Sequence, residues 1–129
     1  MPDSDEKDET LRFVVEEIDS VPELEALLLL WQQRSASWTV NDLAKRLYID
    51  PEQTRALLAG LNRKQLVKMN PGEPETYRYE SRSAEQDAMM GRVEAIYRRE
   101  VVRISTLIHA KPSAAIRDFA RAFRFTKDK

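Results

Sequence analysis

The sequence predicts a mainly α-helical domain that carries one small β-hairpin. Three observations predict this fold class. Four segments combine a helix-capping residue with apolar side chains at helical spacing. Residues 66–79 change to the alternating pattern of two β-strands around a turn. The 129 residues include only 3 glycines and are 33% charged, which is typical of a helix-rich globular chain.

Each predicted helix begins at a capping residue, whose side-chain oxygen accepts a hydrogen bond from a free backbone amide. The third helix also has a proline at its first position, where an amide is not needed. The fourth is the longest and ends before Pro112, because proline disfavours helical backbone at the preceding residue. The predicted helices are 21–33 after Ser20, 40–47 after Thr39, 51–64 after Asp50 and 84–110 after Ser83.

The β-hairpin is predicted over Leu66–Met69 and Thr76–Tyr79, with the turn-forming residues 70–74 between them. Residues 38–40 could add a third short strand. Residues 11–18 form an apolar stretch that could be strand or helix; we expect a helical turn or short helix on the flank of the domain. Beyond the long helix, Ile116, Phe119 and Phe123 predict a further amphipathic turn and a half.

Composition and charge limit the class of protein. Cysteine is absent, and the longest apolar run, residues 26–31, is far shorter than the roughly 20 residues of a membrane span. The acidic N-terminus does not resemble a secretory signal. Residues 1–19 hold 8 acidic and 2 basic side chains, whereas residues 81–129 hold 6 acidic and 11 basic ones. We expect a soluble, cytoplasmic protein with a disordered acidic arm over residues 1–9.

Enzymatic chemistry finds little support in the sequence. His109 is the single histidine and lies near the end of an amphipathic helix, where a structural role is expected. No glycine-rich phosphate loop, metal-ligand cluster or nucleophile with a matched base occurs. We therefore expect neither an enzyme nor a bound cofactor or metal.

The order helix, helix, turn, helix, hairpin, long helix is that of a winged helix-turn-helix domain. The segment "TVNDLAKRLYIDPEQTRALLAGLNRKQLVK", residues 39–68, resembles bacterial winged-helix regulators of the MarR, ArsR and PadR type. The resemblance covers residues 20–80 and rests on Leu43-Ala44, Ile49-Asp50, the spaced leucines 58 and 61, and Leu66-Val67. The whole chain also resembles small uncharacterised bacterial winged-helix proteins that open with "IDSVPELEALLLL", here residues 18–30.

This resemblance implies a winged helix-turn-helix domain at 10–80 and a helical extension with a basic tail at 81–129. It implies that the third helix enters the major groove of double-stranded DNA and that the hairpin, or wing, contacts the backbone. Gln53 suits adenine, and Arg55 suits guanine or phosphate. The remaining candidate DNA contacts are basic residues expected to bind phosphate: Lys45, Arg46, Arg63, Lys64, Lys68 and Arg78.

Three features depart from such regulators. Ala56, Ala59 and Gly60 occupy the centre of the third helix and offer no polar group to a base. Glu73 and Glu75 at the wing tip repel phosphates, so counterion release is lost there. Gln65 replaces the glycine that commonly precedes Leu-Val, so the turn into the hairpin is expected to differ.

The long helix carries an apolar stripe that either forms a homodimer interface or packs on the same domain. The stripe consists of Met89, Val93, Ile96, Tyr97, Val101, Ile104, Leu107 and Ile108. The opposite face is rich in arginine, paired in part with local acidic residues.

Two functions follow from the sequence. The leading hypothesis, based on the fold, is a homodimeric, DNA-binding transcriptional regulator. The second is a winged-helix module that binds another protein and has no specific DNA site. The weakly basic third helix, the acidic wing and the pI of about 5.9 favour the second.

Overall fold

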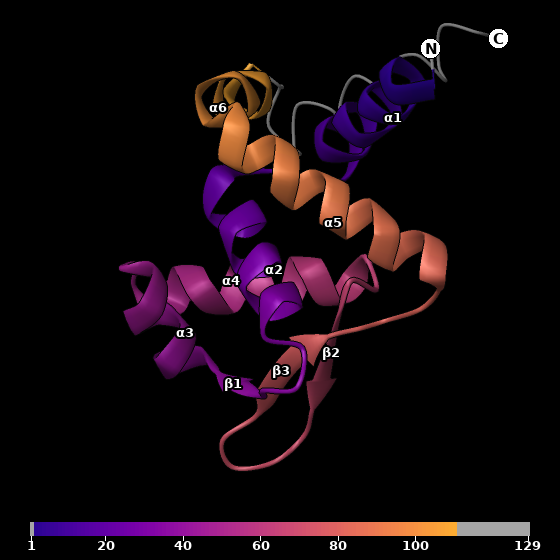
Figure 1. Cartoon of the computed structure of the whole chain (residues 1–129). Coiled ribbons are helices and arrows are strands. Elements are labelled where there is room, and N and C mark those ends of the chain that lie inside the picture. The colour runs from indigo at the N-terminus through magenta and orange to yellow at the C-terminus, as the bar shows by residue number, and fades with distance from the viewer. Residues whose placement is uncertain (1, 111–129) are drawn as a thin grey trace, which may run out of the picture.

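The computed structural model describes residues 2–110, which form six helices and three strands (Figure 1). Their order confirms the predicted winged helix-turn-helix domain followed by a helical extension. None of the described helices is long and apolar enough to cross a lipid bilayer. The elements are α1 (Pro2–Glu17), α2 (Val21–Gln32), β1 (Trp38–Thr39), α3 (Val40–Leu47), α4 (Pro51–Arg63), β2 (Val67–Asn70), β3 (Thr76–Tyr79), α5 (Ala84–Arg99) and α6 (Val101–His109).

All four predicted capping residues begin a helix. In each case the side-chain oxygen accepts a hydrogen bond from the backbone N–H three residues later, as the sequence pattern requires. The local sequence is therefore sufficient to set these four helix starts. The bonds are Glu23 to Ser20 at 3.2 Å, Asp42 to Thr39 at 3.1 Å, Gln53 to Asp50 at 2.8 Å and Gln86 to Ser83 at 3.0 Å.

The wing belongs to a three-stranded antiparallel sheet with the order β1-β3-β2. Trp38 pairs with Tyr77, which confirms the third short strand, and Val67 pairs with Tyr79. Val67, Tyr77 and Tyr79 are buried on the inner face. Lys68 and Arg78 lie opposite each other and are exposed on the outer face, so the wing presents two adjacent cations.

The turn from α4 into β2 keeps the backbone shape that glycine favours, although Gln65 occupies it. Gln65 has a φ of 63°, in the left-handed region. Its N–H donates to the carbonyl of Asn62 at 3.0 Å, and the N–H of Leu66 donates to that of Leu61 at 3.0 Å. The expectation of a different turn is therefore wrong, because these two bonds hold the turn despite the side chain.

Helix α2 lies at the centre of the core (Figure 1). It packs against α3, α4, α5, α6 and β3, and its residues 26–30 are all buried. Leu24, Leu27 and Leu30 are almost completely buried. The apolar run that includes residues 26–30 is thus explained by a helix covered on most sides.

Helix α1 corrects the expectation of a disordered arm over residues 1–9, since the helix begins at Pro2. It also settles residues 11–17 as helix and not strand. Val14 and Ile18 are buried where α1 packs against α5 and α6. Polar contacts extend the packing, because Lys7 Nζ lies 2.9 Å from Glu100 Oε2 and Arg92 Nε donates to Thr10 Oγ1 at 3.2 Å. These partners are about 80 to 90 residues away in the chain, so composition alone could not predict them.

The predicted single helix 84–110 is two helices, α5 and α6, separated at Glu100. Glu100 leaves the helical conformation with φ −131° and ψ 49°. Its carboxylate binds both Lys7 and, at 3.0 Å, Arg103. The bend therefore coincides with the point where the C-terminal helices meet α1. The predicted turn at Ile116, Phe119 and Phe123 and the basic tail lie outside the described residues.

A polar network joins the sheet to the start of α5. The Tyr79 hydroxyl donates to Asp87 Oδ1 at 2.7 Å and accepts from Gln86 Nε2 at 3.1 Å. Burial raises the pKa of Tyr79 to about 12; the bond from Gln86 opposes that rise and the bond to Asp87 adds to it. The hydrogen bonds from Ser81 and Tyr79 hold the pKa of Asp87 below its usual range.

This network predicts a loss of stability in alkali. Tyr79 has a higher pKa in the folded chain than its ordinary value of 10.0, so folding favours the protonated form. The corresponding stability is complete below pH 10 and is lost as the pH rises from 10 to 12, by on the order of 2 kcal/mol. Urea unfolding at pH 9, 10 and 11 should show a shallower decline for Tyr79→Phe than for wild type. Identical slopes for the two proteins would contradict the assignment.

Candidate nucleic-acid interface

Helix α4 presents one buried face and one exposed face. Thr54, Leu57, Leu58 and Leu61 are buried, and α4 packs against α2 and α3. The opposite side is centred on Glu52, Ala56, Ala59 and Arg63, by the 100° turn per residue of a helix. This line of residues is called the α4 ridge below. It offers one cation, one carboxylate and two methyl groups.

Gln53 and Arg55 are both exposed, but they flank the α4 ridge on opposite sides. Their positions differ by about 160° around the helix axis. Arg55 faces the wing, whereas Gln53 lies on the other flank. The two predicted base contacts therefore do not converge on one point, and a duplex on the ridge would meet each from a different side.

A cleft of about 320 Å³ separates α4 from the wing tip. Glu73 and Glu75 line it from the wing, and Arg55 lines it from α4. The Tyr77 hydroxyl donates to Glu75 at 3.2 Å. Burial raises the pKa of Tyr77, the Glu75 carboxylate raises it further, and the Arg55 guanidinium lowers it. Arg55 therefore shares this cleft with two carboxylates, whose negative charge opposes the approach of a phosphate to it.

The other predicted phosphate contacts are divided over the surface. Lys68 and Arg78 lie on the outer face of the wing, and Lys45 is exposed on α3. Arg63 is exposed at the end of the α4 ridge. Arg46 instead lines a groove shared by α2, α3 and α5, whose carboxylates come from Glu25 and Glu94. Arg46 is therefore separated from the α4 and wing surface.

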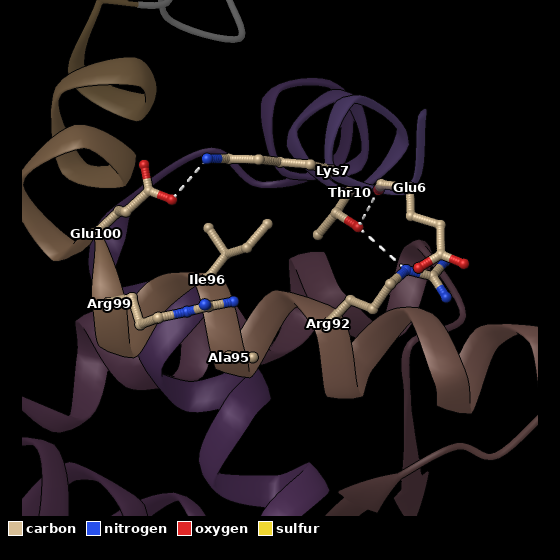
Figure 2. Close-up of a pocket in the computed structure, with 8 residues that line it drawn as sticks. All are labelled: Glu6, Lys7, Thr10, Arg92, Ala95, Ile96, Arg99 and Glu100. Carbon is tan, nitrogen blue, oxygen red and sulfur yellow. Dashed lines mark hydrogen bonds and ion pairs between the residues drawn. The ribbon is translucent and has the colours of Figure 1, made fainter. Parts of the chain in front are cut away.

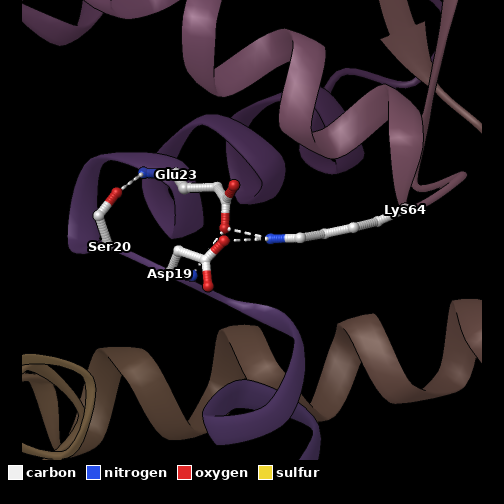
Figure 3. Close-up of polar contacts among 4 residues, drawn as sticks. All are labelled: Asp19, Ser20, Glu23 and Lys64. Atoms are coloured by element: carbon white, nitrogen blue, oxygen red, sulfur yellow. Dashed lines mark hydrogen bonds and ion pairs between the residues drawn. The ribbon is translucent and has the colours of Figure 1, made fainter. Parts of the chain in front are cut away.

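Lys64 is held in a structural cluster and is not a free surface cation (Figure 3). Its Nζ lies 2.8 Å from Glu23 Oε1 and 3.1 Å from Asp19 Oδ2. The backbone N–H of Asp19 also donates to Glu23 Oε1 at 2.8 Å. Glu23 is only 4% exposed, so its charge depends on these donors. Because Glu23 and Lys64 are 41 residues apart, no local sequence pattern indicated that they pair.

Gly60 lies close against this cluster. A Cβ at position 60 would lie 3.2 Å from Glu23 Oε2, tighter than ordinary van der Waals contact. The glycine in the middle of α4 is therefore explained by the close approach of a buried carboxylate. It need not be explained by contact with DNA.

A second cavity, of about 520 Å³, lies between α1 and α5 (Figure 2). Thr10 on α1 and Arg92 and Arg99 on α5 line it, above the apolar floor of Ala95 and Ile96. Thr10 donates to the carbonyl of Glu6 at 2.7 Å. Hydrogen bonds from Lys7 and then Arg103 hold the pKa of Glu100, at the edge of the cavity, below its usual range. Within the described part of the chain, no three His, Cys, Asp or Glu side chains are grouped as metal ligands would be.

The predicted dimer residues differ in how far the single chain buries them. Val93, Ile96, Ile104 and Ile108 are buried in the core of the single chain. Met89, Tyr97 and Leu107 are partly covered, and Val101 is 45% exposed. Val102, which the stripe did not include, is 76% exposed. Most of the stripe therefore packs within its own domain, and the start of α6 is its exposed part.

Comparison of the sequence with protein-family models and with curated proteins gave no match. The fold is similar to solved structures. MepR, a transcription regulator of the Staphylococcus aureus multidrug efflux pump MepA, aligns with a TM-score of 0.55 at 16% identity over 98% of this chain and 90% of MepR. A MepR–DNA complex aligns with a TM-score of 0.55 at 14% identity over 97% and 90% of the two chains.

The heme sensor protein PefR of Streptococcus agalactiae, solved in complex with heme, gives a TM-score of 0.55 at 13% identity over 92% of this chain and 80% of PefR. At such identities the likeness shows the fold. The chain has a winged helix-turn-helix fold, and the solved structures similar to it include a transcription regulator and a heme sensor protein.

The Lys64 cluster predicts an unequal effect of two lysine substitutions. Lys64→Met leaves the buried Glu23 carboxylate without its cation and should lower the free energy of unfolding by about 2 kcal/mol, given that Lys64 is partly exposed. Lys45→Met, on the exposed face of α3, should change it by less than about 0.5 kcal/mol. Urea unfolding measures both. Equal effects would show that the cluster is an ordinary surface ion pair.

Proposed function

We propose that this protein is a DNA-binding transcriptional regulator that contacts duplex DNA through α4 and the wing. The fold supports this proposal, because similar structures are transcription regulators and one of them is a DNA complex. The observation that carries it is the exposed α4 ridge, which the domain leaves uncovered beside the outward-facing cations of the wing. An α-helix of this kind fits the major groove of B-form DNA.

The charges predict the kind of binding. Lys64 and Arg46 are excluded as phosphate contacts by their positions. The predicted phosphate contacts that remain are Lys45, Arg55, Arg63, Lys68 and Arg78. Five such contacts per chain give a strong dependence on salt, with log affinity falling by about 4.5 per tenfold rise in salt. Glu52, Glu73 and Glu75 oppose this attraction. We therefore expect affinity that comes mainly from the backbone and modest discrimination between base sequences.

A homodimer would place two α4 helices on one duplex, one helical turn apart. The start of α6 supports this part of the proposal, because Val101 and Val102 are exposed apolar side chains. Val93, Ile96, Ile104 and Ile108 are buried within the chain. They would support a dimer interface only indirectly, by packing that holds α6 in place.

Fluorescence anisotropy on labelled duplex DNA at 50 and 200 mM salt tests the proposal. Arg55→Ala and Arg63→Ala should each weaken binding about five- to tenfold and reduce the salt slope by about 0.9. Arg12→Ala, on the exposed side of α1, is the matched control and should match wild type. Binding that is absent at 50 mM salt, or is equally affected by the control, would refute the proposal.

The second candidate function is a protein-binding module. The α4 ridge carries the methyl groups of Ala56 and Ala59, near the carboxylates of Glu52 and of the wing tip. These methyl groups favour a protein-binding function, because an apolar helix face fits another protein better than a phosphate backbone. The two candidates predict opposite results for Ala56→Arg.

Under the DNA proposal, Ala56→Arg adds a cation at the centre of the α4 ridge and should raise DNA affinity about tenfold. Under the protein-binding alternative, the variant should stay free of DNA and lose its partner. The same anisotropy assay, combined with size-exclusion chromatography of nuclease-treated protein, measures both outcomes. Circular dichroism confirms that the variant is folded.

A further inference from the structure

Tyr48, in the turn between α3 and α4, has a backbone and a side chain that the fold alone does not explain. Its φ of 59° and ψ of 41° lie in the left-handed region, which favours glycine or asparagine. Its side chain is 94% exposed. The turn itself is held by backbone bonds, since the N–H groups of Tyr48 and Ile49 both donate to the carbonyl of Ala44. A bulky aromatic ring therefore occupies a strained position without packing in the core.

The ring lies at the edge of a groove of about 540 Å³ along α3. Asn41 and Lys45 on α3 line this groove with Tyr48, and Pro51 lines it from the start of α4. Lys45 makes no ion pair among the described residues. The groove thus combines an amide, an unpaired ammonium group and a phenol hydroxyl.

This groove and the cleft between α4 and the wing are neighbours on the surface. Asn41 lines both of them, and the cleft also contains Arg55. A ligand lying across the α4 ridge and the wing would therefore extend onto α3 and Tyr48. The groove has no carboxylate among its lining residues, whereas the wing tip has two. The groove therefore carries the positive charge of Lys45 and is complementary to an anionic partner.

We propose that Tyr48, with Asn41 and Lys45, binds the sugar–phosphate backbone of duplex DNA beside the groove that α4 enters. The inference rests on the proposed DNA binding and adds a contact to it. Lys45 neutralises a phosphate, Asn41 donates to a phosphate oxygen, and the Tyr48 hydroxyl donates to the same strand while its ring covers a sugar. The binding free energy of this contact offsets in part the lack of hydrogen-bonding groups on the α4 ridge. It also offsets in part the repulsion of phosphates by Glu73 and Glu75 at the wing tip.

The left-handed backbone makes the test sharp. Tyr48→Gly and Tyr48→Asn remove the ring but suit the local conformation, so their melting temperatures should not fall below that of wild type. Their affinity for duplex DNA should fall about fivefold, and by the same factor at 50 and 200 mM salt, because no charge is removed. Tyr48→Phe should lose about two- to threefold through its hydroxyl.

Lys45→Ala is the charged counterpart. It should reduce the salt slope by about 0.9, and Arg12→Ala should again match wild type. If wild type binds DNA and the glycine and asparagine variants bind within twofold of it, the inference is overturned and the proposed function stands. If wild type binds no DNA, both fail. The inference would also be overturned if the Tyr48 variants lost a protein partner but kept the DNA affinity of wild type.

Discussion

The ion pair between Lys64 and the buried Glu23 ties the C-terminal end of α4 to the start of α2. One carboxylate oxygen of Glu23 binds the Lys64 ammonium group and the backbone of Asp19, and the other lies against Gly60. The pair thereby joins α4 to the junction between α1 and α2. Since Glu23 is buried, loss of its cation would leave an uncompensated charge in the core. The buried leucines of α4 and this ion pair together hold one side of the helix against the core, which leaves the α4 ridge exposed.

The same arrangement accounts for the composition of α4. Gly60 and the leucines pack in the core, and Ala56 and Ala59 give the α4 ridge short side chains without polar groups. Cations that could bind phosphate lie around the ridge, on the wing and on α3, whereas Glu73 and Glu75 lie beside Arg55. Such a surface favours a duplex held by its backbone on several sides over one read mainly by side chains of the central helix. The position of Tyr48 beyond the ridge is consistent with this distribution.

Local sequence predicted those parts of the structure that depend on neighbouring residues. Thr39 and Asp50 bind amides three residues away, and the alternating residues of the wing bury one face, so both were predictable. Lys64 looked like a surface base because Glu23 lies 41 residues earlier. The helix over residues 2–9 and the bend at Glu100 meet in contacts between distant parts of the chain, such as Lys7 with Glu100, which a local pattern does not contain. Tyr48 carried no motif, and its significance depends on a backbone angle that sequence patterns do not give.

We propose that duplex DNA binds to the surface formed by α3, α4 and the wing. Amide chemical-shift mapping by NMR of this 15.0 kDa chain tests it most directly. On titration with duplex DNA, we expect the largest shifts at residues 41–63 and 68–78, and small shifts along α1 and the cavity beside Arg92. Shifts centred on α1 and α5, or none at low salt, would contradict it.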